Sequence, residues 1–331
     1  MTAVAFNPQV FVGLDQTRLG KPVRSMRVHL KGSYTPLPST VGGQVVTSID
    51  GQTVDRWAVD SSGAIDRWIT IPDSALHRYI NLRVAVDIAG PTGRCGEFQP
   101  VTLRIDDDTT IDSSVADPPA PAGFQSLPQA LMPKVQVGLG REAFTDTVRA
   151  AAILEGLQRL SARPLDTEVV PLADAIDSST PAVLIAANGW DNDKLVPPIR
   201  TSTDGELDVE SIDGGEPAKL TLETAPRFGS LQTVRDGNRT VVIATSDDAP
   251  GLLDAMLSWL DADPSRWASL DGTAVLAPPG RDPVMVNAEA APTDSAQVQS
   301  TSRAALWITV GVVVFVIVGS AAFLLRYRRR A

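Results

Sequence analysis

The sequence has few of the residues on which cysteine and metal chemistry depend. Its 331 residues include one cysteine, Cys95, and two histidines, His29 and His77. A single cysteine cannot form an internal disulfide, and neither histidine has a Cys or His partner at the spacing of a zinc site. We therefore predict that Cys95 is buried rather than reactive, and that the chain has no metal site.

The common catalytic motifs are also missing. The sequence contains no Gly-x-Ser-x-Gly elbow, no Walker loop and no His-Glu-x-x-His helix. A turn of the dinucleotide-binding kind begins at Gly138-Leu139-Gly140, but its third glycine is absent, which favours a structural turn over a nucleotide site. We predict that the chain is not an enzyme and has no catalytic or cofactor-binding residues.

Basic residues are scarce. The chain has 29 Lys and Arg against 39 Asp and Glu, a formal net charge of −10. Because phosphate backbones are bound by basic surfaces, nucleic acid is not an expected partner. Four of the arginines are the closely spaced Arg326, Arg328, Arg329 and Arg330.

Charge is absent altogether from residues 305–325, ALWITVGVVVFVIVGSAAFLL. A helix crosses the ~30 Å hydrocarbon core of a bilayer in about 20 residues. Trp307 and Tyr327 lie near the two ends of the run, where amphipathic rings prefer the membrane interface. The pattern predicts a transmembrane helix at 305–325 with a basic tail at 326–331. The alternative is a buried core helix, which rarely lacks a polar face.

The arginine cluster predicts the orientation, because Lys and Arg beside a membrane span stay in the cytoplasm. We expect a single-pass protein of the cell membrane with a cytoplasmic C-terminus and an extracytoplasmic ectodomain. The start, MTAVAFNPQV, has neither the basic nor the apolar region of a signal peptide. Either the true start lies further upstream, or the protein is tail-anchored with its bulk in the cytoplasm.

Residues 1–115 carry short alternating runs separated by turn residues, namely MRVHLKG, GQVVTSI, DRWITIP and NLRVAVDI. This spacing predicts a β-sandwich, which we take to be jelly-roll-like. Asp50-Gly51, between two of the runs, is typical of a tight hairpin turn. ADPPAPAG then marks a Pro-rich linker, which we place at 116–131.

From 132 to 287 the pattern alternates between strand and helix. KVQVGLG, TEVVPL and AVLIAANG are strand-like, and the apolar residues of 144–160 have helical spacing. Such alternation predicts a flavodoxin-like α/β domain with parallel strands, a lid-like loop at 190–216 and a helix at 249–260. A polar stalk at 288–304 follows, so the expected fold class is α+β multidomain.

Four aromatic residues are candidates for stacking on sugar rings: Trp57, Trp68, Tyr79 and Trp190. Alternation along DRWITI makes Trp68 as consistent with a core position as with an exposed platform. Trp190, beside a polar loop, is the best candidate for exposure.

The segment Asp191-Asn192-Asp193 follows the third strand of the α/β domain, where open α/β sheets usually bind ligands. Its oxygens suit Ca²⁺, but the spacing of an EF-hand is missing, which favours a capped loop. A hydrolase site at Asn188, Trp190, Asp191 and Asp193 is the least favoured alternative.

Several segments carry a family resemblance that runs from about Met26 to the tail. They are VTSIDGQTVDRWAVD at 46–60, DRWITIPDSALHRYINLRVAVDI at 66–88, Cys95-Gly96-Glu97, DDDTTIDSS at 106–114, FQSLPQALMPKVQVGLG at 124–140 and PAVLIAANG at 181–189. With the domain order, they resemble the family of regulatory or accessory subunits of bacterial cellulose synthase. The chain looks like a shortened relative, because it has one β-plus-α/β unit where the family has two. It also has a polar stalk where the family has an amphipathic interfacial helix.

The resemblance implies a non-catalytic partner of a membrane glycosyltransferase that uses UDP-glucose under cyclic di-GMP control. The expected function is a membrane-anchored accessory subunit that guides or stabilises export of a β-glucan or related exopolysaccharide. Its expected partners are a polytopic glycosyltransferase like the cellulose synthase catalytic subunit, the polysaccharide and the lipid bilayer. The alternatives are a stand-alone envelope protein that binds glycans in adhesion and, less favoured, a glycan or ester hydrolase.

Overall fold

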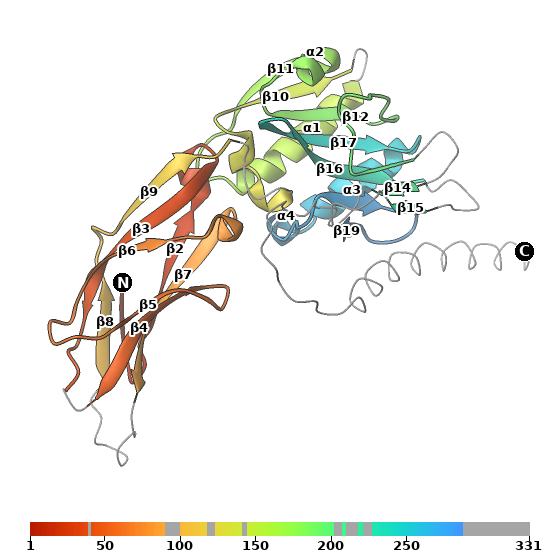
Figure 1. The fold of residues 1–331 in the computed structure, drawn as a ribbon. Coiled ribbons are helices and arrows are strands. Elements are labelled where there is room, and N and C mark those ends of the chain that lie inside the picture. The colour runs from red at the N-terminus through yellow and green to blue at the C-terminus, as the bar shows by residue number, and fades with distance from the viewer. Residues whose placement is uncertain are drawn as a thin grey trace, which may run out of the picture. The chain divides into compact units, whose positions relative to one another are not determined.

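The computed structural model describes eight segments of the chain (Figure 1). They are residues 1–38, 41–89, 100–117, 123–140, 144–201, 207–209, 218–220 and 227–286. Within them are nineteen strands in four sheets, four α-helices and four short 3₁₀ helices. Cys95 lies outside the described residues, as do the predicted stalk and tail.

The N-terminal part is a sandwich of two antiparallel sheets (Figure 1). One sheet has the order β1 (Thr2–Ala5), β8 (Val101–Ile105), β3 (Val23–Tyr34), β6 (Ala64–Thr70), and β9 (Thr110–Val115) also pairs with β3. The other has the order β2 (Gln9–Asp15), β7 (Tyr79–Ala89), β4 (Gly42–Ile49), β5 (Gln52–Ala58). The 3₁₀ turns η1 (Gln16–Leu19) and η2 (Asp73–Ala75) lie between strands. This arrangement is an eight-stranded jelly roll with one added strand.

Alternation fills the sandwich core. On β2, Val10, Val12 and Leu14 point inward and join a cluster drawn from both sheets, whereas Phe11 and Gly13 point outward. Burying one such aliphatic side chain stabilises the fold by about 1.5–3 kcal/mol. The predicted Asp50-Gly51 hairpin turn is confirmed, since both residues have positive φ, 50° and 81°.

The C-terminal part is built on a seven-stranded mixed sheet. Its order is β11 (Asp166–Pro171), β10 (Lys134–Leu139), β12 (Ala182–Ala186), β17 (Arg239–Ser246), β16 (Gly229–Asp236), β18 (Ala274–Ala277), β19 (Val284–Val286). The first four strands pair in parallel, and the remaining pairs, β17 with β16, β16 with β18 and β18 with β19, are antiparallel. A small separate sheet contains β13 (Ile199–Thr201), β14 (Leu207–Val209) and β15 (Ala218–Leu220), and β13 and β14 fall in the predicted lid-like loop.

The expected flavodoxin-like domain is therefore wrong. Only Gly237 and Asn238 join β16 to β17, and Gly237 has a φ of 56°. So short a connection makes a hairpin, whereas parallel neighbours need a crossover of a dozen residues or more. The described structure is mostly β, with its strands spread over four sheets, whereas the sequence predicted a parallel α/β domain.

Helices cover both faces of the mixed sheet. α1 (Phe144–Arg159), α3 (Pro250–Asp261) and α4 (Pro264–Ala268) pack on one face, and α2 (Leu172–Asp177) packs on the other. Trp267 of α4 is fully buried and lies on Gly156 of α1, where an added Cβ would approach the ring to 2.2 Å. The short helices η3 (Phe124–Ser126) and η4 (Gln129–Leu131) belong to this core, although they fall within the predicted linker.

The described residues do not include the membrane part of the expected fold class. Among the described residues, no helix is long and apolar enough to cross a membrane. The predicted span at 305–325 lies outside these residues. The fold that the structure shows is a jelly-roll sandwich followed by a mixed, helix-covered sheet.

Candidate functional site

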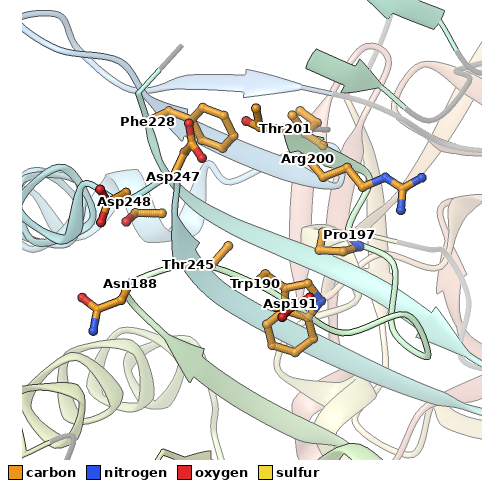
Figure 2. A pocket seen from close by; sticks show the side chains of 13 residues that line it. Asn188, Trp190, Asp191, Pro197, Arg200, Thr201, Phe228, Thr245, Asp247 and Asp248 are labelled. Atoms are coloured by element: carbon orange, nitrogen blue, oxygen red, sulfur yellow. The ribbon is translucent and has the colours of Figure 1, made fainter. Parts of the chain in front are cut away.

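A hollow of about 240 Å³ opens at the carboxyl ends of β12 and β17 (Figure 2). The loop after β12 supplies Asn188 to Asp191, and the turn after β17 supplies Asp247 and Asp248. Its remaining walls include Pro197, β13 and Phe228. Open sheets with parallel strands usually bind ligands at this edge.

The pKa of the Asp247 carboxyl group in this hollow is raised. Partial burial raises its pKa above the ordinary aspartate value, and the negative Asp248 raises it further. The Thr201 hydroxyl and the Arg227 guanidinium act in the opposite direction. The carboxyl group therefore takes up a proton more readily than an exposed aspartate, which suits it to hydrogen bonding with a polar ligand.

The residues that sequence suggested here are largely structural. The indole N–H of Trp190 donates to the carbonyl of Leu195 at 2.8 Å, and its ring packs against the smaller core beneath the sheet. Asn192 Oδ1 accepts from the backbone N–H groups of Lys194 and Leu195, at 3.0 and 3.1 Å. This is the capped loop that the sequence favoured.

Only some of the residues suggested for a hydrolase site lie at the hollow. Asn188, Trp190 and Asp191 line the hollow, but Asp193 does not. Within the part of the chain that the structure describes, no group of three or more His, Cys, Asp or Glu side chains is placed to hold a metal ion.

Trp57 closes the edge of the sandwich. It lies on the edge strand β5 opposite Val45, and its partly buried ring packs against the core. The guanidinium of Arg67, on the edge strand of the opposite sheet, lies 4.9 Å from the ring centroid and binds Asp55 at 2.6 Å. Its hydrogen bond lowers the pKa of the Asp55 carboxyl group. Because Arg67 covers it, Trp57 is not an open stacking platform.

Trp68 lies on the outer face of its sheet, so of the two positions that alternation allowed, the core position is wrong. Its side chain is 45% exposed and stacks on His29, with ring centroids 4.5 Å apart and planes at 12°. Arg27 lies 5.0 Å from the ring centroid and is paired with Asp112. His29 Nε2 contacts Asp66 at 2.5 Å. The indole is therefore held by neighbours that also offer polar groups beside it.

Tyr79 is the most open of the four candidates. It begins β7 on the outer face of the second sheet and is 56% exposed. The neighbouring strand adds Phe11, 52% exposed, which was not predicted from the sequence. The period-two alternation of QVFVGLD would have placed Phe11 outward, because the valines on either side of it are core residues.

The structure does not bring the four candidates together. Trp68 lies on one sheet of the sandwich, Trp57 and Tyr79 lie on the other, and Trp190 lies in the C-terminal part. Comparisons with protein-family models and with characterised proteins find no match to this chain. The class that fold and site define is a jelly-roll sandwich with exposed aromatic residues on its outer faces, joined to a mixed-sheet part with a small hollow of mixed polar and apolar lining.

Proposed function

We propose that the protein is a non-catalytic accessory subunit of a cellulose-synthase-like glycosyltransferase, and that it guides or stabilises an emerging β-glucan. The observation that carries this proposal is the exposure of Trp68 and Tyr79 at outward positions on the two faces of one sandwich. Flat rings on a stiff sheet suit the apolar faces of sugar rings, and no deep cleft is needed to bind a long chain.

The surroundings of these rings support binding rather than turnover. Beside Trp68, the carboxylates Asp66 and Asp112 are already engaged with His29 and Arg27. A catalytic site would need an acid and a base free to exchange protons with a bound substrate in a water-poor pocket. Weak, open contacts instead let a polymer slide past.

The location that goes with this proposal is the outer side of the cell membrane. It rests on the sequence alone, on the uncharged run at 305–325 and the arginines that follow. UDP-glucose and cyclic di-GMP would act on the synthase partner and not on this chain.

Co-purification tests the proposal. The full-length chain, tagged and extracted from host membranes in mild detergent, is expected to bring down a polytopic glycosyltransferase. Recovery of the chain alone would contradict the proposal and favour a stand-alone glycan-binding protein of the envelope. A Trp68→Ala/Tyr79→Ala variant serves as the matched control: it should retain the synthase but lower the yield of exported glucan.

A further inference from the structure

The outer face of the sheet β2–β7–β4–β5 carries both Phe11 and Tyr79. Phe11 is paired with Arg83 and Tyr79 with Asp15, so the two rings belong to the same face and one row, that of Gly13 and Asn81, lies between theirs. Exposed apolar residues gathered on one face are a feature of binding surfaces, whereas those scattered singly need no partner.

Gly13 provides the seat for Tyr79. A Cβ at this position would lie 2.2 Å from the tyrosine hydroxyl and 3.0 Å from the ring carbon that bears it. Only a residue without a side chain lets the phenol ring lie against β2. Glycine weakens a strand interior, and its presence there often marks a close approach to the backbone. Here the approaching group is an aromatic ring that remains exposed on its other side.

Polar groups flank the rings. Arg83 Nε donates to Gln9 Oε1 at 2.7 Å, and Asn81 is exposed between the rows of Phe11 and Tyr79. Next to Gln9, the same rows of the sheet carry Ala85 and Val46, whose side chains are short and buried. The surface is therefore low at this point. The side-chain amides of Gln9 and Asn81 and the hydrogen-bonded guanidinium of Arg83 offer both hydrogen-bond donors and acceptors. They do not form a cluster of like charges.

The same outer face extends past Ala85 and Val46 toward the far ends of β4 and β7. Gln44 pairs with Asp87, and these two residues and Arg56 line a hollow of about 620 Å³. Tyr79 and Asp87 are eight residues apart on β7, which corresponds to about 27 Å at ~3.4 Å per residue. Such a length accommodates several consecutive sugar units.

We propose that this outer face is the principal binding surface for a neutral polysaccharide chain, with Phe11 and Tyr79 as stacking platforms. Arg83, Gln9 and Asn81 hydrogen-bond the hydroxyl groups of the chain, which runs toward Gln44 and Asp87. A neutral polyol fits better than an ionic polymer, because the face has no run of unpaired like charges. The inference deepens the proposed function, on which its ligand class rests.

Native affinity electrophoresis of the full-length chain in mild detergent tests this surface, with hydroxyethylcellulose in the gel and dextran as the comparison polymer. Hydroxyethylcellulose should retard the wild type more strongly than dextran, because the proposed function makes a β-glucan the expected ligand. The Phe11→Ala/Tyr79→Ala variant should bind at least about tenfold more weakly. Tyr79→Phe keeps the ring and should bind like the wild type.

Trp68→Ala is the matched control, since it removes an exposed ring from the opposite face, and its loss of affinity should be smaller. Gly13→Val tests the contact between Gly13 and Tyr79 independently. It displaces the Tyr79 ring without removing it and should also weaken binding. Full retardation of Phe11→Ala/Tyr79→Ala, or a larger loss in Trp68→Ala, would overturn this surface while leaving the proposed function intact. A wild type that binds no β-glucan would overturn both. Failure to co-purify a synthase, together with retardation of the wild type by hydroxyethylcellulose, would remove the proposed function and leave this surface standing.

Discussion

The two parts of the molecule use their aromatic residues in opposite ways. In the sandwich, aliphatic side chains fill most of the core, Tyr34 is the buried aromatic exception, and Phe11, Trp68 and Tyr79 remain exposed. In the C-terminal part, Trp267 and Phe124 are fully buried and help to build the core. Phe144, at the first position of α1, is the exposed exception.

This difference separates stability from recognition. Removing a buried ring leaves a cavity and loses its contacts, whereas removing an exposed ring costs the fold little. Substitutions in the C-terminal part should therefore change unfolding, and substitutions on the sandwich faces should change binding. Each prediction below is a way to break or sharpen that separation.

The largest effect is expected for Trp267→Ala. The substitution should cost about 3–5 kcal/mol of unfolding free energy, because it empties the space between α1 and α4. Amide hydrogen exchange, measured peptide by peptide, should show faster exchange in α1, α3 and α4 and unchanged exchange in the sandwich. Trp267→Phe is the control, which retains most of the volume and loses the 2.9 Å hydrogen bond from Nε1 to Asp261. Equal loosening of the sandwich strands would refute the separation.

Arg239→Ala should have the next largest effect. The buried guanidinium donates to the carbonyls of Ala175, Ile176 and Thr180 at 2.7–3.0 Å, which closes the end of α2. Without it these carbonyls lose a charged donor, at a cost of about 2–3 kcal/mol. Arg239→Lys should recover only part of the loss, because one ammonium cannot reproduce the planar fork. Denaturant midpoints of the three proteins would measure this, and a lysine variant as stable as the wild type would contradict the role.

The pair of Asp55 and Arg67 predicts a small pH dependence in the sandwich. The hydrogen bond from Arg67 lowers the folded pKa of Asp55, so the folded state favours the carboxylate. Its contribution is fully present above the unfolded value of about 3.9 and is lost as the pH falls through the lower folded pKa. The Arg67 side chain is 43% exposed, which limits the contribution to about 0.5–1 kcal/mol. Denaturation of wild type and Asp55→Asn between neutral and acidic pH should show this term only in the wild type.

The smallest effect on stability is expected for Trp68→Ala, within about 0.5 kcal/mol. The side chain is already exposed, and its stacking on His29 is a surface contact. A thermal melt alongside wild type would measure this. A loss as large as that of Trp267→Ala would mean that the sandwich depends on its surface ring, and the comparison would fail.

Local features were the ones that the sequence predicted well. The helix expected at 144–160 is α1 at 144–159, and the Asp50-Gly51 turn was recognised from two residues. Both depend on interactions between near neighbours in the chain. Alternation also located strands such as β3 and β7, whose inward and outward residues differ in character.

Features that depend on distant partners could not be predicted. A strand-like sequence pattern does not say whether the strand pairs in parallel or antiparallel with its neighbours. The antiparallel pairing of β16 is therefore seen only in the structure, where it lies between β17 and β18. The side to which Trp68 points depends on which sheet face meets the other sheet. The hydrogen bond from the Trp190 indole N–H to the Leu195 carbonyl depends on a loop conformation that no motif in the sequence predicts.

The bridge formed by Arg67, Trp57 and Asp55 joins the two edge strands β5 and β6. Unpaired edges offer backbone groups to any strand that arrives from another molecule, and charged side chains there discourage such addition. Asp55, Arg56, Asp66 and Arg67 supply that charge on the open side of the sandwich. The sandwich thus exposes aromatic rings on its broad faces, while the charged edge strands β5 and β6 discourage pairing between copies of the protein.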